Sequence, residues 1–320
     1  MSYTHFDKVS GINGLAVGKK GSEKVVSDAL GRMYLNFEPG AQFYVDSVHG
    51  AAGNDGLTWA TALAGIDAAI GKCTANHGDV IWVAPGHVET ITATDITVDI
   101  AGVTVVGLGT GSLMPQIKHN NAAAEVSIAA DNVTWMGIRH SADVTDVKVA
   151  IEIEDGADYC TVKGCVFDVI TTGTDEFLVS VRTNDASNFA TIEDNDFDMG
   201  IGGATAAISF TEDTDGTVVK NNRIQGDYSA ACINGITTLS TKLLIEKNLL
   251  INGGAADIGA LPAIVLLTGS TGIIRDNDIV CNLATMAASV VADTCLLFRN
   301  YYNEDVTGTG TVFGTPSADG

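Results

Sequence analysis

Short hydrophobic runs recur along most of the chain and are separated by polar turns. Within several runs the apolar residues alternate with polar ones, as in Ile151-Glu152-Ile153 and Ile208-Ser209-Phe210. A period of two residues is typical of a β-strand that buries one face and exposes the other. The pattern therefore predicts an all-β protein made of many short strands.

One motif, a short strand, a polar turn and a second short strand, recurs with nearly constant spacing. Its turn position is occupied by Leu108, Ile138, Cys165, Asn195, Asn222, Asn248, Asn277 and Asn300, in steps of 30, 27, 30, 27, 26, 29 and 23 residues. A further hydrophobic stretch separates successive copies. A unit of about 27 residues without a helix must bury its hydrophobic face against its neighbours, which makes a solenoid.

The repeat predicts a right-handed single-stranded parallel β-helix of about eight or more rungs over residues 91–303. Leucine-rich repeats would show Leu-x-x-Leu-x-Leu, and propeller blades are longer than this unit. Residues 304–320 are expected to form a C-terminal tail or cap.

Asparagine occupies five consecutive turn positions in the C-terminal half of the repeat. Stacked side-chain amides can hydrogen-bond along a column, and Asn tolerates the left-handed backbone of sharp turns. We interpret Asn195, Asn222, Asn248, Asn277 and Asn300 as a structural turn ladder. A ligand site lined by these amides is the alternative.

Residues 41–90 are predicted to cap the N-terminal end of the β-helix. Apolar residues at 59, 63, 66, 70 and 73 have helical spacing, and Thr58 is a suitable N-cap. We therefore expect one α-helix over residues 58–73 that plugs the N-terminal mouth.

Residues 1–40 lie outside the repeat, are rich in Gly, and hold five of the 17 Lys and Arg residues. We expect this segment to be an extended arm that anchors the chain to another subunit. The residues expected to carry the anchoring are Phe6, Lys8, Lys19, Lys20 and Lys24. A disordered leader is the alternative.

The composition narrows the classes of partner. The net charge is 17 − 39 = −22, with 46% hydrophobic and 18% charged residues. This content excludes intrinsic disorder, and the acidic balance argues against nucleic acid as a partner. No hydrophobic run is long enough to span a membrane, and the first residues lack the apolar core of a signal peptide. Six cysteines without a C-x-x-C pair are expected to be reduced thiols buried in the core.

A family resemblance adds to this picture. The segments Phe43–Ser47, Gly53–Gly56, the helix at 58–73 and Gly78–His87 resemble the N-terminal module of pectate-lyase-like β-helix proteins. This superfamily includes phage tailspikes, polysaccharide lyases and virion surface proteins. The likeness covers residues 41–91 in detail and residues 92–303 by repeat pattern alone. Residues 1–40 are similar to N-terminal segments of small phage virion proteins.

The catalytic blocks of β-helix enzymes are absent. Polygalacturonases would show Asn-Thr-Asp, Asp-Asp, Gly-His-Gly and Arg-Ile-Lys, and no Arg or Lys stands in a lyase motif. A divergent glycosidase needs only two carboxylates. Asp168 and Asp198 each follow the turn position by three residues and are expected on adjacent rungs, and the pairs Glu152/Glu154 and Asp194/Asp196 are expected to share a strand face. Because 39 acidic residues generate such pairs freely, we expect solvated faces, with catalysis at Asp168 and Asp198 as the alternative.

These observations predict a non-catalytic bacteriophage virion protein that decorates or cements the capsid, assembles in the host cytoplasm and binds the major capsid protein. The β-helix would project outward as a homotrimer that packs through apolar positions in Leu261–Leu267 and Leu296–Phe298. No cofactor, metal, nucleic acid or membrane is expected. The alternative is a tailspike or receptor-binding protein that binds or cleaves a host surface polysaccharide with carboxylates.

Overall fold

The computed structural model describes residues 40–171, 173–184, 186–200, 203–253, 261–281, 286–292 and 294–302. The chain divides into two compact units, residues 1–40 and 41–320, and the description below concerns the second. The proposed anchoring residues Phe6, Lys8, Lys19, Lys20 and Lys24 lie outside the described residues, as do residues 304–320.

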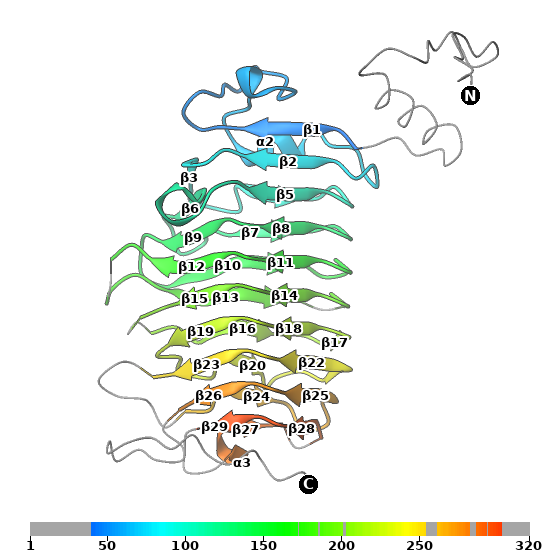
Figure 1. The fold of residues 1–320 in the computed structure, drawn as a ribbon, viewed down its shortest axis with the longest axis vertical. Helices are drawn as coiled ribbons and strands as arrows, with labels where there is room; N and C mark the ends of the chain where they lie inside the picture. The colour runs from blue at the N-terminus through cyan, green and yellow to red at the C-terminus, as the bar shows by residue number, and fades with distance from the viewer. Residues whose placement is uncertain are drawn as a thin grey trace, which may run out of the picture. The chain divides into compact units, whose positions relative to one another are not determined.

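Three long parallel sheets make up the second unit (Figure 1). Sheet A contains β1 (Gln42–Val45), β2 (Val80–Val83), β5 (Thr104–Gly107), β8 (Thr134–Met136), β11 (Thr161–Lys163), β14 (Thr191–Glu193), β18 (Val218–Lys220), β22 (Leu243–Glu246), β25 (Gly272–Arg275) and β28 (Leu296–Phe298). Sheet B contains β3 (Val88–Ile91), β6 (Gln116–His119), β9 (Arg139–Ala142), β12 (Val166–Val169), β15 (Asp196–Asp198), β19 (Arg223–Gly226), β23 (Leu249–Asn252), β26 (Asp278–Val280) and β29 (Tyr301–Tyr302). Sheet C contains β4 (Ile96–Val98), β7 (Val126–Ile128), β10 (Val147–Ile153), β13 (Phe177–Thr183), β16 (Ala206–Phe210), β20 (Ile233–Gly235), β24 (Ile264–Leu266) and β27 (Val290–Val291).

The remaining elements are short. They are the strand pair β17 (Thr214–Asp215) and β21 (Ser240–Thr241), the 3-10 turns η1 (Trp59–Thr61) and η2 (Gly111–Leu113), and the helices α2 (Ile66–Ile70) and α3 (Met286–Ser289).

The chain visits sheets A, B and C in turn, as β5, β6 and β7 do before β8 returns to sheet A. Each strand inside these sheets pairs in parallel with the strands one turn before and after it, and each edge strand pairs with one. The prediction of an all-β parallel β-helix of about eight turns is therefore confirmed. Stacked strands begin with β1, so residues 41–90 already contribute β1, β2 and β3 to the sheets.

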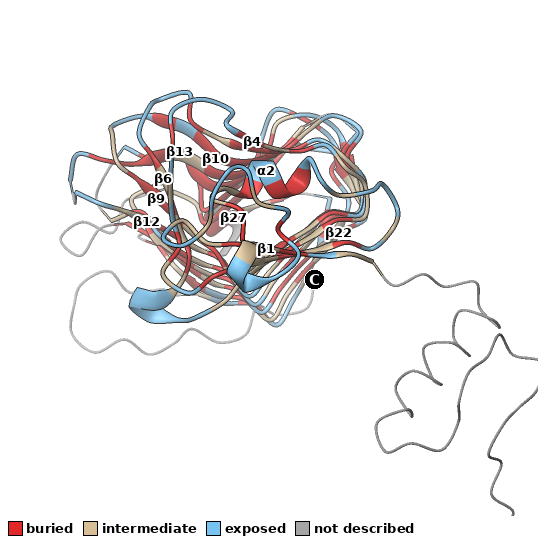
Figure 2. Cartoon of the chain, turned by 90° about the horizontal axis from the view of Figure 1, so that it is seen from above, coloured by how far each residue is buried: buried red, intermediate tan, exposed pale blue. Residues whose placement is uncertain are grey.

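The core runs through the coil without a break between turns, as the buried segments inside the stack show (Figure 2). Its register places like residues above one another: Val162 of β11 pairs with Ile192 of β14, which pairs with Val219 of β18, and all three are fully buried. Burying one such side chain contributes about 1.5–3 kcal/mol. The apolar residues that alternate along each strand therefore stack into continuous columns that face the core.

The predicted helix over 58–73 is replaced by two short pieces, η1 and α2. Thr58 does act as an N-cap, because its side chain accepts a hydrogen bond from the Thr61 N–H, but the helical turn it caps ends at once. Leu63 pairs in parallel with Val45, and its N–H and C=O bond to the backbone beside β1. That pairing withdraws the Leu63 backbone from any helix, and α2 begins only after Gly65. Helix α2 packs against β1, β2 and β4 at the N-terminal end of the coil (Figure 2).

Candidate functional site

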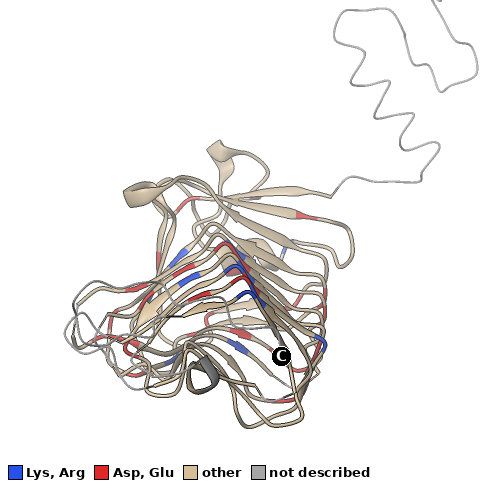
Figure 3. Ribbon diagram, turned by 60° about the horizontal axis from the view of Figure 1, so that its bottom comes forward, with Lys and Arg blue, Asp and Glu red and all other residues tan. Residues whose placement is uncertain are grey.

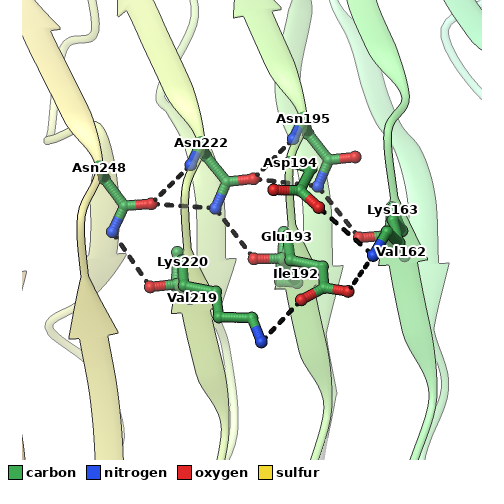
Figure 4. Close-up of polar contacts among 10 residues, drawn as sticks. All are labelled: Val162, Lys163, Ile192, Glu193, Asp194, Asn195, Val219, Lys220, Asn222 and Asn248. Atoms are coloured by element: carbon green, nitrogen blue, oxygen red, sulfur yellow. Dashed lines mark hydrogen bonds and ion pairs between the residues drawn. The ribbon is translucent and has the colours of Figure 1, made fainter.

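The asparagine column lies at the corner between sheets A and B (Figure 4). Asn222 is typical of its interior members. Its Oδ1 accepts hydrogen bonds from the backbone N–H and the Nδ2 of Asn195, at 3.0 and 3.1 Å. Its Nδ2 donates to the Ile192 carbonyl at 2.9 Å and to the Oδ1 of Asn248 at 3.0 Å. Asn248 and Asn277 repeat this arrangement toward Asn300, so the interior amides of the column are fully used by the scaffold.

The left-handed backbone at this corner belongs to the residue before each asparagine. Asp194, Asn221, Lys247, Asp276 and Arg299 have φ between 47° and 58°. The expectation that the ladder asparagines themselves take this conformation is therefore wrong. Their side chains are needed to bond along the column, and the preceding residue makes the turn.

Basic and acidic residues occupy successive strands of the coil (Figure 3), and on sheet A their side chains pair with one another (Figure 4). Lys163 and Lys220 both bind Glu193, at 2.7 and 2.8 Å, and Arg275 binds Glu246 at 2.6 Å on the following rungs. Hydrogen bonds from the two lysines hold the pKa of Glu193 below its usual value. These charges compensate one another along the sheet.

Asp168 and Asp198 lie on the outer face of sheet B, as their spacing predicted. The strands β12 and β15 pair with Phe167 opposite Phe197, which sets Asp168 next to Asp198 on adjacent strands. Neighbouring strands are about 4.8 Å apart. Asp168 is partly buried and accepts a hydrogen bond from Ser141, whereas Asp198 is exposed.

A polar network surrounds Asp168. Gln116 donates to the Oγ of Ser141 at 2.8 Å, and the buried Nε of Arg139 lies 3.7 Å from Asp168 Oδ2 without a hydrogen-bond partner among the described residues. Burial raises the pKa of Asp168; the Ser141 hydrogen bond and Arg139 oppose the rise, and Asp198 and Asp196 add to it. A protonated carboxyl beside an exposed carboxylate can act as a general acid paired with a base or nucleophile.

A second carboxylate cluster lies beside sheet C and joins Glu125 to Glu152 and Glu154. One oxygen from each of the three lies within 4.8 Å of the others. Arg182 donates to both oxygens of Glu152, at 2.9 and 2.6 Å, and Ser127 donates to Glu154 at 2.8 Å. Burial is the main reason that the pKa of Glu125 is raised, and the charges of Glu152 and Glu154 add to it.

The sequence pointed to Glu152 and Glu154 but missed Glu125. The register of β7 and β10 sets Ser127, not Glu125, beside Glu152, so the repeat spacing gave no signal for Glu125. Carboxylate oxygens are the ligands that Ca²⁺ and Mg²⁺ prefer, but Arg182 already compensates Glu152.

The pair Asp194 and Asp196 does not share a strand face. Asp194 sits at the left-handed corner and lies 3.3 Å from Lys163, whereas Asp196 begins β15 and binds Arg223 at 2.7 Å. The corner turns the chain between the two residues, so the period of two does not apply across it.

All six cysteines are free thiols, and five of them are buried. No helix in the described part of the chain is both long and apolar enough to cross a membrane.

Comparisons with known proteins add little to this geometry. The sequence matches no protein-family model and no curated protein. One solved structure similar to it is a GH136 lacto-N-biosidase from Eubacterium ramulus, at 12% sequence identity. The alignment covers 88% of this chain and 70% of that chain, with a TM-score of 0.27. A likeness this low carries no argument about activity.

Proposed function

We propose that this protein is a structural protein of a bacteriophage virion, a capsid decoration or cement protein without catalytic activity. Residues 1–40 anchor the chain to the major capsid protein, and the β-helix projects outward as a homotrimer. The proposal rests on the sequence resemblance together with the way the β-helix uses its surface charges.

The observation that carries the proposal is the compensation of the outward charges. Glu193 is held by two lysines, Glu246 by Arg275 and Glu152 by Arg182. Because each of these carboxylates is bound by a cation, none of them is a free base or nucleophile for a substrate. Such a surface is compatible with a structural role.

Apolar side chains at the C-terminal end of the coil support self-association. Leu296 and Phe298 of β28 are 58% and 38% exposed, and Tyr301 of the neighbouring β29 is 38% exposed. The other stretch expected to face a partner differs, since Ile264–Leu266 forms β24 and is buried. We therefore propose that copies pack through the β28 and β29 surface.

A deletion tests the anchor. A chain without residues 1–40 should remain a folded trimer in size-exclusion chromatography with light scattering, yet be lost from purified particles. The matched control removes residues 304–320 and should retain attachment. Particles that still carry the chain lacking residues 1–40 would contradict the proposed anchor, and a monomeric full-length chain would contradict the trimer.

Cleavage or binding of a host surface polysaccharide is the second candidate, and the Asp168 network favours it. The strand spacing of about 4.8 Å is close to the roughly 5–5.5 Å between the carboxyl groups of retaining glycosidases. Asp168, with its raised pKa, would be the general acid and Asp198 the nucleophile. A depolymerisation assay on host polysaccharide decides between the two functions. Activity that disappears in Asp168→Asn and Asp198→Asn, but not in the exposed control Asp278→Asn, would replace the structural proposal.

A further inference from the structure

Three polar ring groups meet in the core between sheets A and B. They belong to Trp135 of β8, His140 of β9 and His119 of β6, and all three side chains are fully buried. Trp135 Nε1 lies 3.0 Å from His140 Nε2, His140 Nδ1 lies 3.1 Å from His119 Nε2, and His119 Nδ1 lies 3.0 Å from the carbonyl oxygen of Ala124. The four groups form one hydrogen-bonded chain.

The protons in this chain have one consistent order. An indole N–H only donates, so His140 Nε2 must accept and carries no proton. A neutral His140 then has its proton on Nδ1 and donates it to His119 Nε2. His119 in turn has its proton on Nδ1 and donates it to Ala124. Every polar atom in the chain is satisfied only while both rings are neutral.

The surroundings offer no compensation for a positive charge. The His140 ring stacks on Phe167 at 5.2 Å, and His119 meets Phe177 edge-on at 4.9 Å. Besides burial, the charge of His119 lowers the pKa of His140. The charged residues of the packed strands and of the loop before β7 occupy their outer faces: Lys118, Arg139, Asp168, Arg182 and Glu125. Glu89, on the inward column of β3, is bound by His87 and by the Ile66 N–H.

We propose that the Trp135–His140–His119 chain is an acid-sensitive switch that keeps the turns around β6, β8 and β9 closed at neutral pH and opens them on acidification. A proton added to His119 Nε2 would face the N–H of His140, and one added to His140 Nε2 would face the N–H of Trp135. Either event replaces a hydrogen bond by two opposed donors and leaves a buried cation without a counter-charge. The switch is independent of the proposed virion role.

The way in which folding stability changes with pH follows from the difference in proton binding between the folded and unfolded states. Burial lowers the pKa of His119 to about 4 and lowers the pKa of His140 well below its usual value. The folded state therefore binds fewer protons than the unfolded state, whose histidines titrate near 6.5. The contribution to stability is complete above about pH 6.5 and is lost as the pH falls toward 4. Between pH 8 and pH 5, His119 alone lowers the folding equilibrium constant about 30-fold. Protonation of Glu125 and Asp168, whose pKa values are raised, acts with the opposite sign.

Hydrogen exchange on the full chain, corrected for intrinsic rates, tests the switch between pH 8 and pH 5. Peptides over 116–142 should lose about 30-fold or more of their protection, whereas peptides over 243–251 in the same molecule should change much less. Equal loss in both regions would overturn the proposal. His119→Gln keeps a donor and an acceptor while removing one titrating ring, so its pH dependence should shrink. The exposed His49→Gln is the control and should behave as the unaltered chain.

A second measurement does not depend on how the variants fold. Nitrogen-15 NMR of the histidine rings at pH 7.5 should show both His119 and His140 as neutral rings protonated at Nδ1. Both rings should stay neutral at pH 6, where exposed histidines titrate. An Nε2-protonated tautomer at either residue, or titration near pH 6.5, would overturn the proposed proton order.

Discussion

The corner between sheets A and B is built in two ways along the same coil. In the C-terminal half, a non-glycine residue takes the left-handed turn and a buried asparagine follows it, as in Lys247-Asn248. In the N-terminal half a glycine takes the turn and an apolar residue follows it, as in Gly137-Ile138 and Gly164-Cys165. The same backbone path thus tolerates a polar or an apolar interior.

The polar and the apolar form of this corner are stabilised by different interactions. The asparagine column is stable because each interior amide makes four hydrogen bonds with the rungs beside it, so every member depends on its neighbours. In the apolar half, close backbone approach occurs at Gly107 and Gly137, whereas a Cβ on Gly164 would meet nothing within 4 Å. A Cβ on Gly107 would lie 2.1 Å from the Gly137 carbonyl oxygen, and one on Gly137 would lie 2.8 Å from that of Gly107. The two halves should therefore fail under different substitutions.

The largest effect is expected from Asn222→Ala. It removes the acceptor of the buried Asn195 backbone N–H and the amide donor to the Ile192 carbonyl. It also removes one of the two partners of Asn195 Nδ2 and one of the two partners of Asn248 Oδ1. We expect a loss of about 3 kcal/mol or more in the free energy of unfolding, measured by urea denaturation at pH 7. The control is Asn234→Ala on the outer face of sheet C, which should cost less than about 0.5 kcal/mol. Equal losses in the two variants would show that the hydrogen bonds of the column do not contribute to the free energy of unfolding.

Gly137→Ala should have the next largest effect. The residue has φ of 72°, and its new Cβ would press against the Gly107 carbonyl. We expect a loss of about 1–3 kcal/mol in the same measurement. The matched variant in the other half is Lys247→Gly, which relieves a left-handed non-glycine residue and should change stability by less than about 1 kcal/mol. A Gly137→Ala variant with unchanged stability would contradict the requirement for glycine at this position.

The smallest effect is expected from Cys165→Asn, which extends the column by one rung. The Cys165 N–H already donates to the Oδ1 of Asn195, and the thiol lies 3.9 Å from the Trp135 carbonyl that a new amide would reach. The change in stability should stay within about 1 kcal/mol, whereas Ile138→Asn should cost more because Cys165 offers it no amide. Introducing Cys165→Asn into the Ile138→Asn chain should recover part of that loss in a double-mutant cycle. Strictly additive effects would exclude coupling along the column.

Much of the coil was readable from the sequence, because period and spacing are local properties. Alternation identifies the inward residue of each strand, and a repeat of about 27 residues places equivalent residues above one another. The turn position and the adjacency of Asp168 and Asp198 followed from this spacing. The repeat did not give the arrangement of Glu125 with Glu152 and Glu154, because the register sets Ser127 beside Glu152 and Glu125 precedes β7.

Other features were decided only by the tertiary structure. The helix expected over 58–73 is interrupted because the backbone of Leu63 pairs in parallel with Val45. Asp194 and Asp196 separate because a corner falls between them. His119 and His140 bond through the core although they are 21 residues apart. The sequence by itself determined which side of each strand faces inward, since that depends on local alternation. Which inward side chains meet depends on where the corners bend and how the loops shift each strand along its neighbour, and only the folded coil decides that.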